Sequence, residues 1–507
     1  MRTLSKKEFL ALAGAAVLLV PALLLNLNIV PLYGEEPRRA VVAMEMLFRH
    51  NWLVPTVNGD TYYLKPPFFN WILASLYTLT GVNSELITRL PTVLSALLLG
   101  LVIYVTGKRY VSRTFGALSA MLFLTAAGNL FFNSMLAEID LFYSLVTYTS
   151  LVCLFHFRQQ GKYLMLFVTV YFLGAISVLT KGAPSLVYTG LSLLVFFISN
   201  REFKKLFTFT HLIGILIFLV IIGGYFLAYS KQGDVMLYLK NLSFESGKRF
   251  SGDTIWDYLL QMIWFPADTL LNLLPASLLI VFALRKGFFG TLNGNPLMKF
   301  AFLMLVIHYP VYWLPPGGRQ RYIIMLYPFI IQIFTYFYLE FISVESRKAS
   351  FLSRLRPIVI VYLIFIMIAA RVVFDLVVLP VRAKEGKSAD NKMMALKLYE
   401  LTKDSQVAVY RSTYFPMQCT YYLERLRNEI VPRHWDVIEG YSYFVQKIVV
   451  TPYSYRREIG EAMENPLKPA SQFTENHEEL FSGYDYKTLY IYSLQKRPYL
   501  LVTPVHF

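Results

Sequence analysis

The chain contains about eleven apolar stretches, each about 18–23 residues long, and short polar segments connect them. A helix of that length crosses the ~30 Å hydrocarbon layer of a bilayer. We predict membrane spans near residues 10–30, 88–107, 114–132, 140–157, 163–179, 184–199, 208–229, 265–284, 300–314, 322–341 and 357–381. Short apolar helices such as 67–80 bring the predicted total to about 11–13. A hydrophobic fraction of 56% with 16% charged residues excludes an ordinary soluble protein.

Basic residues in the connecting segments predict the orientation. They fill every second connection, and the positive-inside rule makes that side cytoplasmic. They are Arg2, Lys6, Lys7, Lys108, Arg109, Arg113, Arg158, Lys162, Arg201, Lys204, Lys205, Arg285, Lys286, Lys299, Arg347, Lys348, Arg354 and Arg356. Because this bias explains most of the net charge of +16, we expect no nucleic-acid partner. We expect a multi-pass protein of the cell inner (plasma) membrane. No small-residue cleavage site follows the first apolar run, so we expect it to be retained as a helix.

The chain changes character near residue 382. We predict a transmembrane domain over 1–381, with a catalytic outer loop over 31–87, and a soluble extracytoplasmic (periplasmic) α/β domain over 382–507. The expected strands of the tail are Gln406–Tyr410, Lys447–Thr451 and Thr488–Tyr492, and its expected helices are Lys392–Leu401 and Tyr455–Met463. The two cysteines, Cys153 and Cys419, predict no disulfide framework.

The outer loop after the first span is the most informative polar segment. Residues 32–71 read LYGEEPRRAVVAMEMLFRHNWLVPTVNGDTYYLKPPFFNW, and Glu35, Glu36, Arg38 and Lys65 are among its charged residues. An ionisable group costs about 2.5–3.5 kcal/mol at a bilayer centre, so this cluster marks the membrane surface. Acids at a helix start are often caps, but two acids followed by two arginines at this boundary favour a functional site.

Local signals within this loop predict a helix and a hairpin. Pro37 suits the first turn of a helix that runs to about His50. Asn58-Gly59 is a hairpin turn signal between residues 54–57 and 61–64. Such a hairpin presents Lys65, and the two prolines after it prevent further strand pairing.

Acids and cations also occur in later outer loops. Glu138 and Asp140 lie at the start of a span in FFNSMLAEIDLF, where interfacial acids that reach water are the alternative interpretation. Lys181, in LTKGAP, fits a boundary anchor better than a ligand. Further cations follow in NLSFESGKRFSGD and LPPGGRQRYIIMLYP, against the positive-inside bias. Guanidinium and ammonium groups bind phosphate oxygens, so an anionic ligand explains these cations.

The chain resembles the aminoarabinose transferase and protein O-mannosyltransferase group, which are polyprenyl-phosphate-sugar glycosyltransferases of the C superfamily. The resemblance rests, in chain order, on GEEPRRAVVAMEM, NWLVPTVNGDTYYLKPPFFNW, LTKG, FESGKRF and RQRYIIMLYP. It covers roughly residues 5–340, and no motif of the group was matched in the tail. It implies a multi-helix membrane bundle with a soluble outer domain.

The resemblance also implies roles for single residues. Glu35 falls at the first-loop catalytic acid, which is commonly Asp, and Arg38 matches the arginine after it. Asp140 falls at the acid that begins the fourth span. Lys65 matches the lysine that contacts the lipid phosphate. The further substrate-binding candidates are Arg249, Tyr322, Arg321, Glu36, Glu138, Lys248 and Arg319.

The aminoarabinose branch binds zinc with the help of an acid before that lysine and a histidine after the later loop acid. Leu64 and Ser246 occupy these two positions here, so we expect no essential cofactor. A divalent metal stays open, because several outer-loop acids are placed to gather around one. These acids are Glu35, Glu36, Glu138, Asp140 and Glu245.

We expect inverting transfer of a sugar from a polyprenyl-phosphate donor to an envelope acceptor at the outer face. The acceptor is lipid A, another glycolipid, a glycan or a protein. A lipid-linked-sugar flippase or carrier is the alternative, and it predicts charged residues along the spans. The main such residues, Arg371 and Asp375, lie four apart and are expected to pair with each other. A non-catalytic envelope scaffold is a third alternative, and it requires no acids beside cations in the outer loops.

Overall fold

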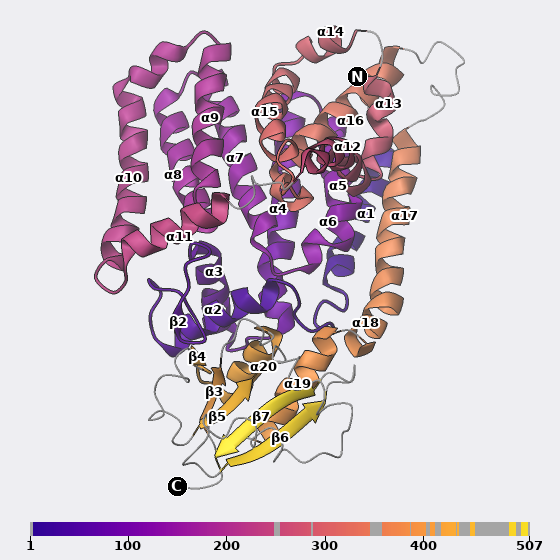
Figure 1. Ribbon diagram of the computed structural model, residues 1–507. Helices are drawn as coiled ribbons and strands as arrows, with labels where there is room; N and C mark the ends of the chain where they lie inside the picture. The colour runs from indigo at the N-terminus through magenta and orange to yellow at the C-terminus, as the bar shows by residue number, and fades with distance from the viewer. Residues whose placement is uncertain are drawn as a thin grey trace. The chain divides into compact units, whose positions relative to one another are not determined.

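The computed structural model shows long helices and a small sheet (Figure 1). It describes residues 4–247, 254–284, 287–344, 357–385, 387–401, 406–410, 417–431, 433–434, 447–451, 486–492 and 498–504. The chain forms two compact units. The first comprises Met1–Leu27, Tyr63–Phe69 and Arg89–Leu376, and the second comprises Asn28–Tyr62, Asn70–Thr88 and Val377–Phe507.

Eight helices of the described residues are long and apolar enough to cross a membrane. They are α1 (Lys6–Leu24), α4 (Glu85–Tyr110), α7 (Ile139–Gln159), α8 (Tyr163–Lys181), α10 (Phe209–Tyr229), α15 (Pro296–Trp313), the segment Ile324–Ser343 that contains most of α16 (Tyr327–Val344), and the segment Pro357–Glu385 that begins with α17 (Pro357–Val373). Two bent helix pairs raise the number to 10, and α9 (Pro184–Ser199) is a shorter apolar helix. Each predicted span overlaps one of these helices, so the helical membrane fold is confirmed.

One span was predicted near 265–284, and the structure shows a bent pair of helices there instead. The helix α12 (Ile255–Asn272) begins earlier, where Thr254 and Asp257 form a capping box. After α12 the chain bends by 107° before η4 (Ala276–Leu279) and α13 (Ile280–Ala283). Pro275 lies at this bend and has no N–H to continue the helical hydrogen bonds. The run 114–132 is likewise bent, by 44°, between α5 (Arg113–Leu124) and the segment Ala127–Met135 that begins with α6 (Ala127–Phe131).

Glycines permit two features of the bundle. In α5, a Cβ on Gly116 would lie 2.5 Å from the carbonyl oxygen of Tyr104 in α4, so only glycine allows this close helix approach. Gly182 ends α8 with φ of 81°, a left-handed conformation that favours glycine. Pro184 then occupies the first turn of α9. The junction between α8 and α9 is therefore sharp.

The charged residues of α17 and of the segment after it pair with each other inside the bundle. Arg371 Nε donates to Asp375 Oδ2 over 2.7 Å, and both side chains are 0% exposed. Arg371 also donates to the carbonyl of Leu130. The expected pairing of these two residues is confirmed, which weakens the translocation-path alternative.

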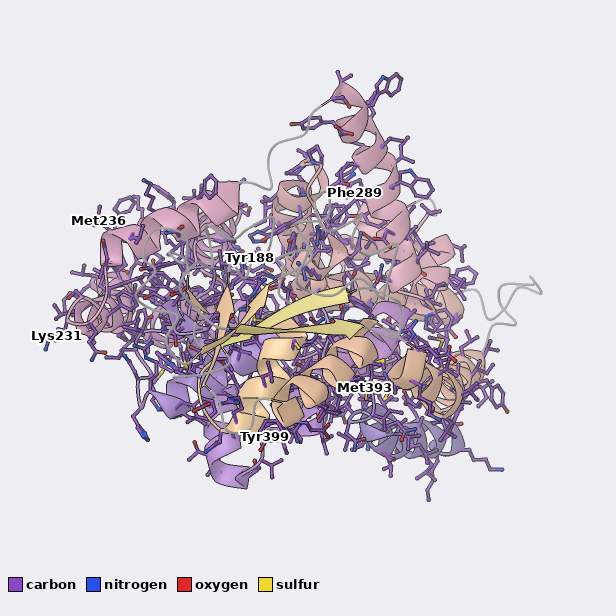
Figure 2. The ribbon with its side chains drawn as sticks, turned by 60° about the horizontal axis from the view of Figure 1, so that its bottom comes forward. Tyr188, Lys231, Met236, Phe289, Met393 and Tyr399 are labelled. Carbon is purple, nitrogen blue, oxygen red and sulfur yellow. The ribbon has the colours of Figure 1, made fainter. Side chains whose placement is uncertain are left out.

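Apolar side chains cover much of the outward surface of the first unit. Leu216, Leu219 and Val220 of α10 are more than half exposed. Figure 2 labels two further examples, Met236 of α11 (Val235–Gly247) and Phe289 of α14 (Phe288–Asn293). Such a surface is expected where lipid chains replace water.

The second unit contains the loop after the first span except for residues 63–69, which belong to the first unit. Its helix α2 (Glu36–Phe48) and its hairpin of β1 (Thr56–Val57) and β2 (Asp60–Thr61) confirm the predicted elements, although the strands are short. Asn58 and Gly59 have φ of 53° and 78°, as a type I′ turn requires. The loop continues into α3 (Phe68–Thr80), whose first two residues belong to the first unit.

The described tail contains α18 (Leu379–Glu385), α19 (Lys387–Leu401), α20 (Met417–Arg427) and one five-stranded sheet. The strand order is β4-β3-β5-β7-β6, with bounds Arg433–His434, Gln406–Tyr410, Lys447–Thr451, Pro498–Pro504 and Tyr486–Tyr492. The pairs β3–β4 and β3–β5 are parallel, and the pairs β5–β7 and β6–β7 are antiparallel. Three strands and two helices were predicted, and β3, β5, β6 and α19 correspond to the three strands and the first helix. The helix predicted over Tyr455–Met463 lies outside the described residues, and β4, β7 and α20 were not predicted.

Glu85 joins the loop to the tail within this second unit. Its carboxylate accepts hydrogen bonds from Lys392 at 2.9 Å, Tyr422 at 2.9 Å and Arg425 at 3.1 Å. Asn58 of the hairpin donates to the carbonyl of Val431 at 2.9 Å. The α/β character of the tail is confirmed, whereas the domain boundary near 382 stays a prediction.

Two buried carboxyl groups face each other in this unit. Glu45 of α2 and Glu424 of α20 are both 0% exposed. Each accepts one backbone N–H, from Gly59 and Val431 respectively, and the other oxygen of each carboxyl is buried without a hydrogen-bond partner among the described residues. Burial, and then the neighbouring Glu45 carboxylate, raises the pKa of Glu424 well above its usual 4.5. Glu424 therefore keeps its proton at pH values above 4.5, where an exposed carboxyl group has lost it, and this proton can be shared with Glu45.

This proton makes stability depend on pH. Because the pKa of Glu424 is higher in the folded than in the unfolded chain, its stabilising contribution is present below pH 4.5 and is lost as pH rises toward the folded pKa. Glu424→Gln keeps a hydrogen-bond donor and cannot titrate, so its melting temperature is expected to fall less than that of the wild type between about pH 5 and about pH 8. Glu429→Gln, which removes an exposed carboxylate, is expected to behave as the wild type. Equal slopes for Glu424→Gln and the wild type would contradict the shared proton.

Candidate functional site

A buried ion pair lies where α7 begins and α8 ends. Asp140 is in the first turn of α7, and Lys181 is the last residue of α8. The Lys181 Nζ is 2.6 Å from the Asp140 Oδ1, and the side chains are 5% and 8% exposed. Lys181 was expected to be a boundary anchor. The structure corrects this, because the ammonium group is buried against a predicted catalytic acid.

Tyrosines and a second cation surround this pair. The Lys181 Nζ lies 4.6 Å from the ring centre of Tyr143 and 5.4 Å from that of Tyr322. The guanidinium carbon of Arg321 lies 5.5 Å from the Tyr322 ring centre. Cations at such distances are attracted to an aromatic face. The ring of Tyr322 therefore lies close to both Lys181 and Arg321.

Arg321 is held beside two acids. Its Nη1 forms an ion pair with the Glu138 Oε1 over 3.8 Å. The arginine side chain is 31% exposed. Burial lowers the pKa of Arg321, but the charges of Asp140, Tyr322 and Glu138 outweigh it and hold that pKa above its usual value. The Arg321 Nε has no hydrogen-bond partner among the described residues. The guanidinium is thus charged, and because the arginine side chain is 31% exposed, an anion can reach it.

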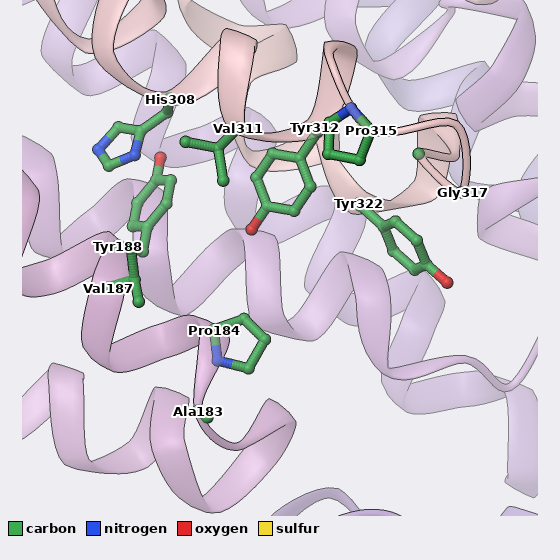
Figure 3. A pocket seen from close by; sticks show the side chains of 11 residues that line it. Ala183, Pro184, Val187, Tyr188, His308, Val311, Tyr312, Pro315, Gly317 and Tyr322 are labelled. Atoms are coloured by element: carbon green, nitrogen blue, oxygen red, sulfur yellow. The ribbon is translucent and has the colours of Figure 1, made fainter. Parts of the chain in front are cut away.

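An apolar cavity of about 180 Å³ begins at Tyr322 (Figure 3). The start of α9 contributes Pro184, Val187 and Tyr188, the end of α15 contributes His308 and Tyr312, and the Pro-Pro-Gly-Gly turn closes it. The Tyr188 ring stacks on His308 at 3.9 Å between centres, and the His308 Nε2 is 2.7 Å from the hydroxyl of Ser192. A space of this size and lining fits an apolar chain.

The Lys-Pro-Pro segment belongs to the same unit. Tyr238 donates to the carbonyl of Lys65 at 3.3 Å, and the Tyr63 and Tyr238 ring centres are 6.0 Å apart. A Cβ built on Gly182 would lie 3.8 Å from the Cγ of Pro66. Half-buried Lys65 therefore lies on a segment that reaches the residue next to Lys181.

The two adjacent acids of the first loop, in the second unit, have different surroundings. The Glu35 Oε2 is 2.6 Å from the Arg38 Nη1, with the side chains 35% and 30% exposed. Glu36 is fully buried and accepts the backbone N–H of Tyr33 at 3.0 Å. Arg39 donates to the hydroxyl of Tyr62 at 3.0 Å. Glu36 thus occupies a structural position rather than a substrate-facing one, and Glu35 is the accessible acid.

The structure brings Glu138, Asp140, Arg321 and Tyr322 together, and it adds Lys181. Arg319 is exposed just before η5 (Gln320–Tyr322). Lys248 and Arg249 lie outside the described residues, as does the side chain of Glu245. A sequence signal for Lys181 existed, because it is a lone cation at an outward junction where the positive-inside bias disfavours one.

A divalent metal finds no ready-made set of ligands in the described part of the chain. No three His, Cys, Asp or Glu side chains gather there in a way that could hold a metal ion. The acids of the candidate site have cationic partners instead, in the pairs Asp140–Lys181 and Glu138–Arg321, and in the second unit Glu35 pairs with Arg38. This arrangement suits recognition of an anion by the cations.

Known protein sequences and one family model match part of the chain. The family model described as dolichyl-phosphate-mannose-protein mannosyltransferase matches residues 64–225. The undecaprenyl phosphate-alpha-4-amino-4-deoxy-L-arabinose arabinosyl transferase 1 of Proteus mirabilis (strain HI4320) is 32% identical over 176 residues, or 34% of this chain and 32% of that protein. The transferase of the same description, without the number, from Edwardsiella ictaluri (strain 93-146) is 26% identical over 285 residues, or 52% and 49%. The chain spans less than two thirds of the length of the curated relatives that it matches.

Comparison of the structure matches nearly the whole chain. ArnT from Cupriavidus metallidurans in the apo state has a TM-score of 0.68 at 15% identity, with 97% of both chains covered. The same protein bound to undecaprenyl phosphate has a TM-score of 0.67. At this identity the match shows the fold alone.

The buried ion pair leads to a stability prediction. Lys181→Met leaves the Asp140 carboxylate buried without its partner and is expected to lower the free energy of unfolding by about 3–5 kcal/mol. Adding Asp140→Asn removes the unpaired charge and is expected to restore most of the loss. Thermal unfolding of the purified protein in detergent measures both effects. A double variant as unstable as Lys181→Met would show that Lys181 stabilises the fold through other contacts.

Proposed function

We propose that this chain, whose fold is similar to that of ArnT from Cupriavidus metallidurans, is an inverting glycosyltransferase that uses a polyprenyl-phosphate sugar as donor. The acceptor is a molecule of the cell envelope, either lipid A or another glycolipid, a glycan or a protein. The observation that carries the proposal is the apolar cavity that begins at Tyr322, whose ring also contacts Lys181 and Arg321. Such a site suits a ligand with an anionic head and an apolar tail.

The name of the Proteus mirabilis relative supports the same donor class, since that protein is described as taking its sugar from undecaprenyl phosphate. The matched segment of the family model includes Lys65, Asp140 and Lys181. The leaving group in this reaction is a polyprenyl monophosphate, whose negative charge grows as the glycosidic bond breaks. Lys65, Arg321 and Arg249 are the proposed phosphate-binding cations, and preorganised cations of this kind lower the barrier.

The chemical step is a single displacement. A hydroxyl oxygen of the acceptor attacks the anomeric carbon, its proton passes to the Glu35 carboxylate, and the bond from the anomeric carbon to the phosphate oxygen breaks. Arg38 orients Glu35 through their 2.6 Å contact. Asp140 positions Lys181 through their buried contact. We place the reaction at the outer face of the inner membrane, because the positive-inside rule puts the loops of these residues there.

We further propose that the reaction needs no metal. The support is that the carboxylates of Glu35, Glu138 and Asp140 each pair with a cationic side chain, which balances their charge without a divalent ion. Sugar transfer by the purified protein is expected to continue in the presence of a chelator. Loss of transfer with chelator and its return with added metal would contradict this part of the proposal.

Glu35→Gln tests the proposed base. Because general base catalysis contributes about 10²–10⁴-fold, the turnover of a polyprenyl-phosphate sugar is expected to fall by that factor with an unchanged melting temperature. The assay measures release of polyprenyl phosphate from a panel of donors in the presence of envelope extract. Glu429→Gln is the matched control, because it removes an exposed carboxylate from the second unit. An unfolded Glu35→Gln protein would assign Glu35 to the fold, and full activity would remove it from the reaction.

Lys65→Ala tests the proposed phosphate contact. A lost charge-assisted hydrogen bond is expected to weaken donor binding by about tenfold. Lys231, labelled in Figure 2, is an exposed lysine after α10, and Lys231→Ala is expected to bind donor as the wild type does. Equal loss in both variants would mean that only the general surface charge matters. Specific donor binding by a wild type that turns over no donor would favour the carrier alternative.

A further inference from the structure

The first unit contains a second, larger cavity at the other end of α7. It has a volume of about 600 Å³, and the ends of α7 and α9 line it together with α14 and the first half of α15. Arg158 of this cavity and Asp140 of the candidate site lie at opposite ends of α7. With a rise of 1.5 Å per residue, about 27 Å of helix separates them, which is close to the thickness of a hydrocarbon layer.

The cavity lining changes from polar to apolar along each helix. In α7, Arg158 lies about one turn closer to the helix end than Phe155. At the end of α9, Asn200 lies about one turn beyond Phe196. All four residues line the cavity. The polar residues are therefore at the level where the helices end, and the aromatic rings are deeper in the bundle.

The helix α15 begins at this end of the bundle and repeats the gradient in the opposite chain direction. Lys299 is in its first turn, and Leu303 and Val306 follow one and two turns further into the bundle. A polar entrance above an apolar interior matches an amphiphile, with a head group at the helix ends and a chain below it.

The charges at the entrance favour a single negative charge. Arg158 donates to Glu202 through Nη2 at 2.8 Å and through Nε at 3.4 Å, which fixes the guanidinium and leaves its Nη1 outside this contact. Tyr163 also donates to Glu202, at 3.1 Å. Glu202 does not line the cavity. Lys299 is exposed and has no acidic partner among the described residues. The two cations of the cavity lining and the carboxylate of Glu202 sum to one positive charge.

We propose that this cavity binds an anionic phospholipid, with its phosphodiester between Arg158 and Lys299 and an acyl chain among Phe155, Phe196 and Leu303. A phosphodiester carries one negative charge, which matches the charge of the entrance, and guanidinium and ammonium groups are the usual phosphate partners. Phe289, at the edge of the cavity in α14, is 63% exposed, so an acyl chain has a route from the surrounding lipid. The site is separate from the donor site by the length of α7.

The experiment is lipid binding to the purified, delipidated full-length protein, measured by native mass spectrometry without sugar donor. Phosphatidylglycerol is expected to bind, and Lys299→Gln is expected to weaken its binding by about tenfold. Lys204→Gln is the matched control, because Lys204 is an exposed cation of the loop after α9 and does not line the cavity. Leu303→Trp, which fills the apolar part, is also expected to weaken binding. Melting temperatures establish that each variant is folded.

Each contrary result overturns a defined part of the proposal. Equal loss in Lys299→Gln and Lys204→Gln, or no loss in either, would remove the cavity as the binding site. Phosphatidylcholine bound as tightly as phosphatidylglycerol would remove the charge assignment. Glycerol phosphate that competes with phosphatidylglycerol at equal concentration would identify a soluble phosphate as the ligand and overturn the lipid. Because no arm requires sugar transfer, these results are independent of the proposed activity.

Discussion

The cost of placing a charge in an apolar environment governs this structure. A charged side chain within a membrane bundle needs a partner of opposite sign, because neither water nor lipid chains stabilise it there. The pairs Asp140–Lys181 and Arg371–Asp375 meet this requirement with contacts of 2.6 Å and 2.7 Å. The second pair is sealed inside the bundle. The first lies at the end of α8, where Tyr322 connects it to a cavity, so the same requirement produces a structural pair in one place and a candidate site in the other.

The outer loop and the tail meet a different requirement. Outside the hydrocarbon layer, polar side chains can hold distant segments together through hydrogen bonds, and Glu85 does so with three partners from the tail. The Glu45–Glu424 pair adds a contact that depends on one proton. The second unit therefore combines its apolar core with buried polar contacts, and the Glu45–Glu424 pair is expected to make its stability depend on pH.

Local features of the sequence predicted the structure well. Asn58-Gly59 identified the hairpin, because a type I′ turn needs two residues that tolerate positive φ. The apolar runs located the helices, since hydrophobic length is a local property. The bend at Pro275 was not predicted. The sequence shows the proline, but the apolar run continues through it, so hydrophobicity alone does not indicate where the helix changes direction.

Features that depend on distant partners were not predictable. Lys181 looked like an anchor because its partner, Asp140, is 41 residues away in the sequence. The helix α20 was missed because its sequence is polar, and its burial comes from packing against the distant helices α19 and α2. Glu35 and Glu36 are adjacent and identical in type, yet Glu35 precedes α2 and is partly exposed, whereas Glu36 begins the helix and is buried.

At the Lys-Pro-Pro segment the chain leaves the second unit, enters the first, and then returns to the second. Residues 63–69 belong to the first unit, while both flanking stretches, 28–62 and 70–88, belong to the second. The proposed phosphate-binding Lys65 and the proposed base Glu35 are therefore carried by separate bodies, although only 30 positions separate them in the sequence. Holding the leaving group and accepting the proton are then separable tasks. Under the proposed mechanism, substitutions in the first unit are expected to change donor affinity and leave the proton acceptor intact. Substitutions in the second unit, which includes the tail, are expected to change proton transfer and leave the phosphate contact intact.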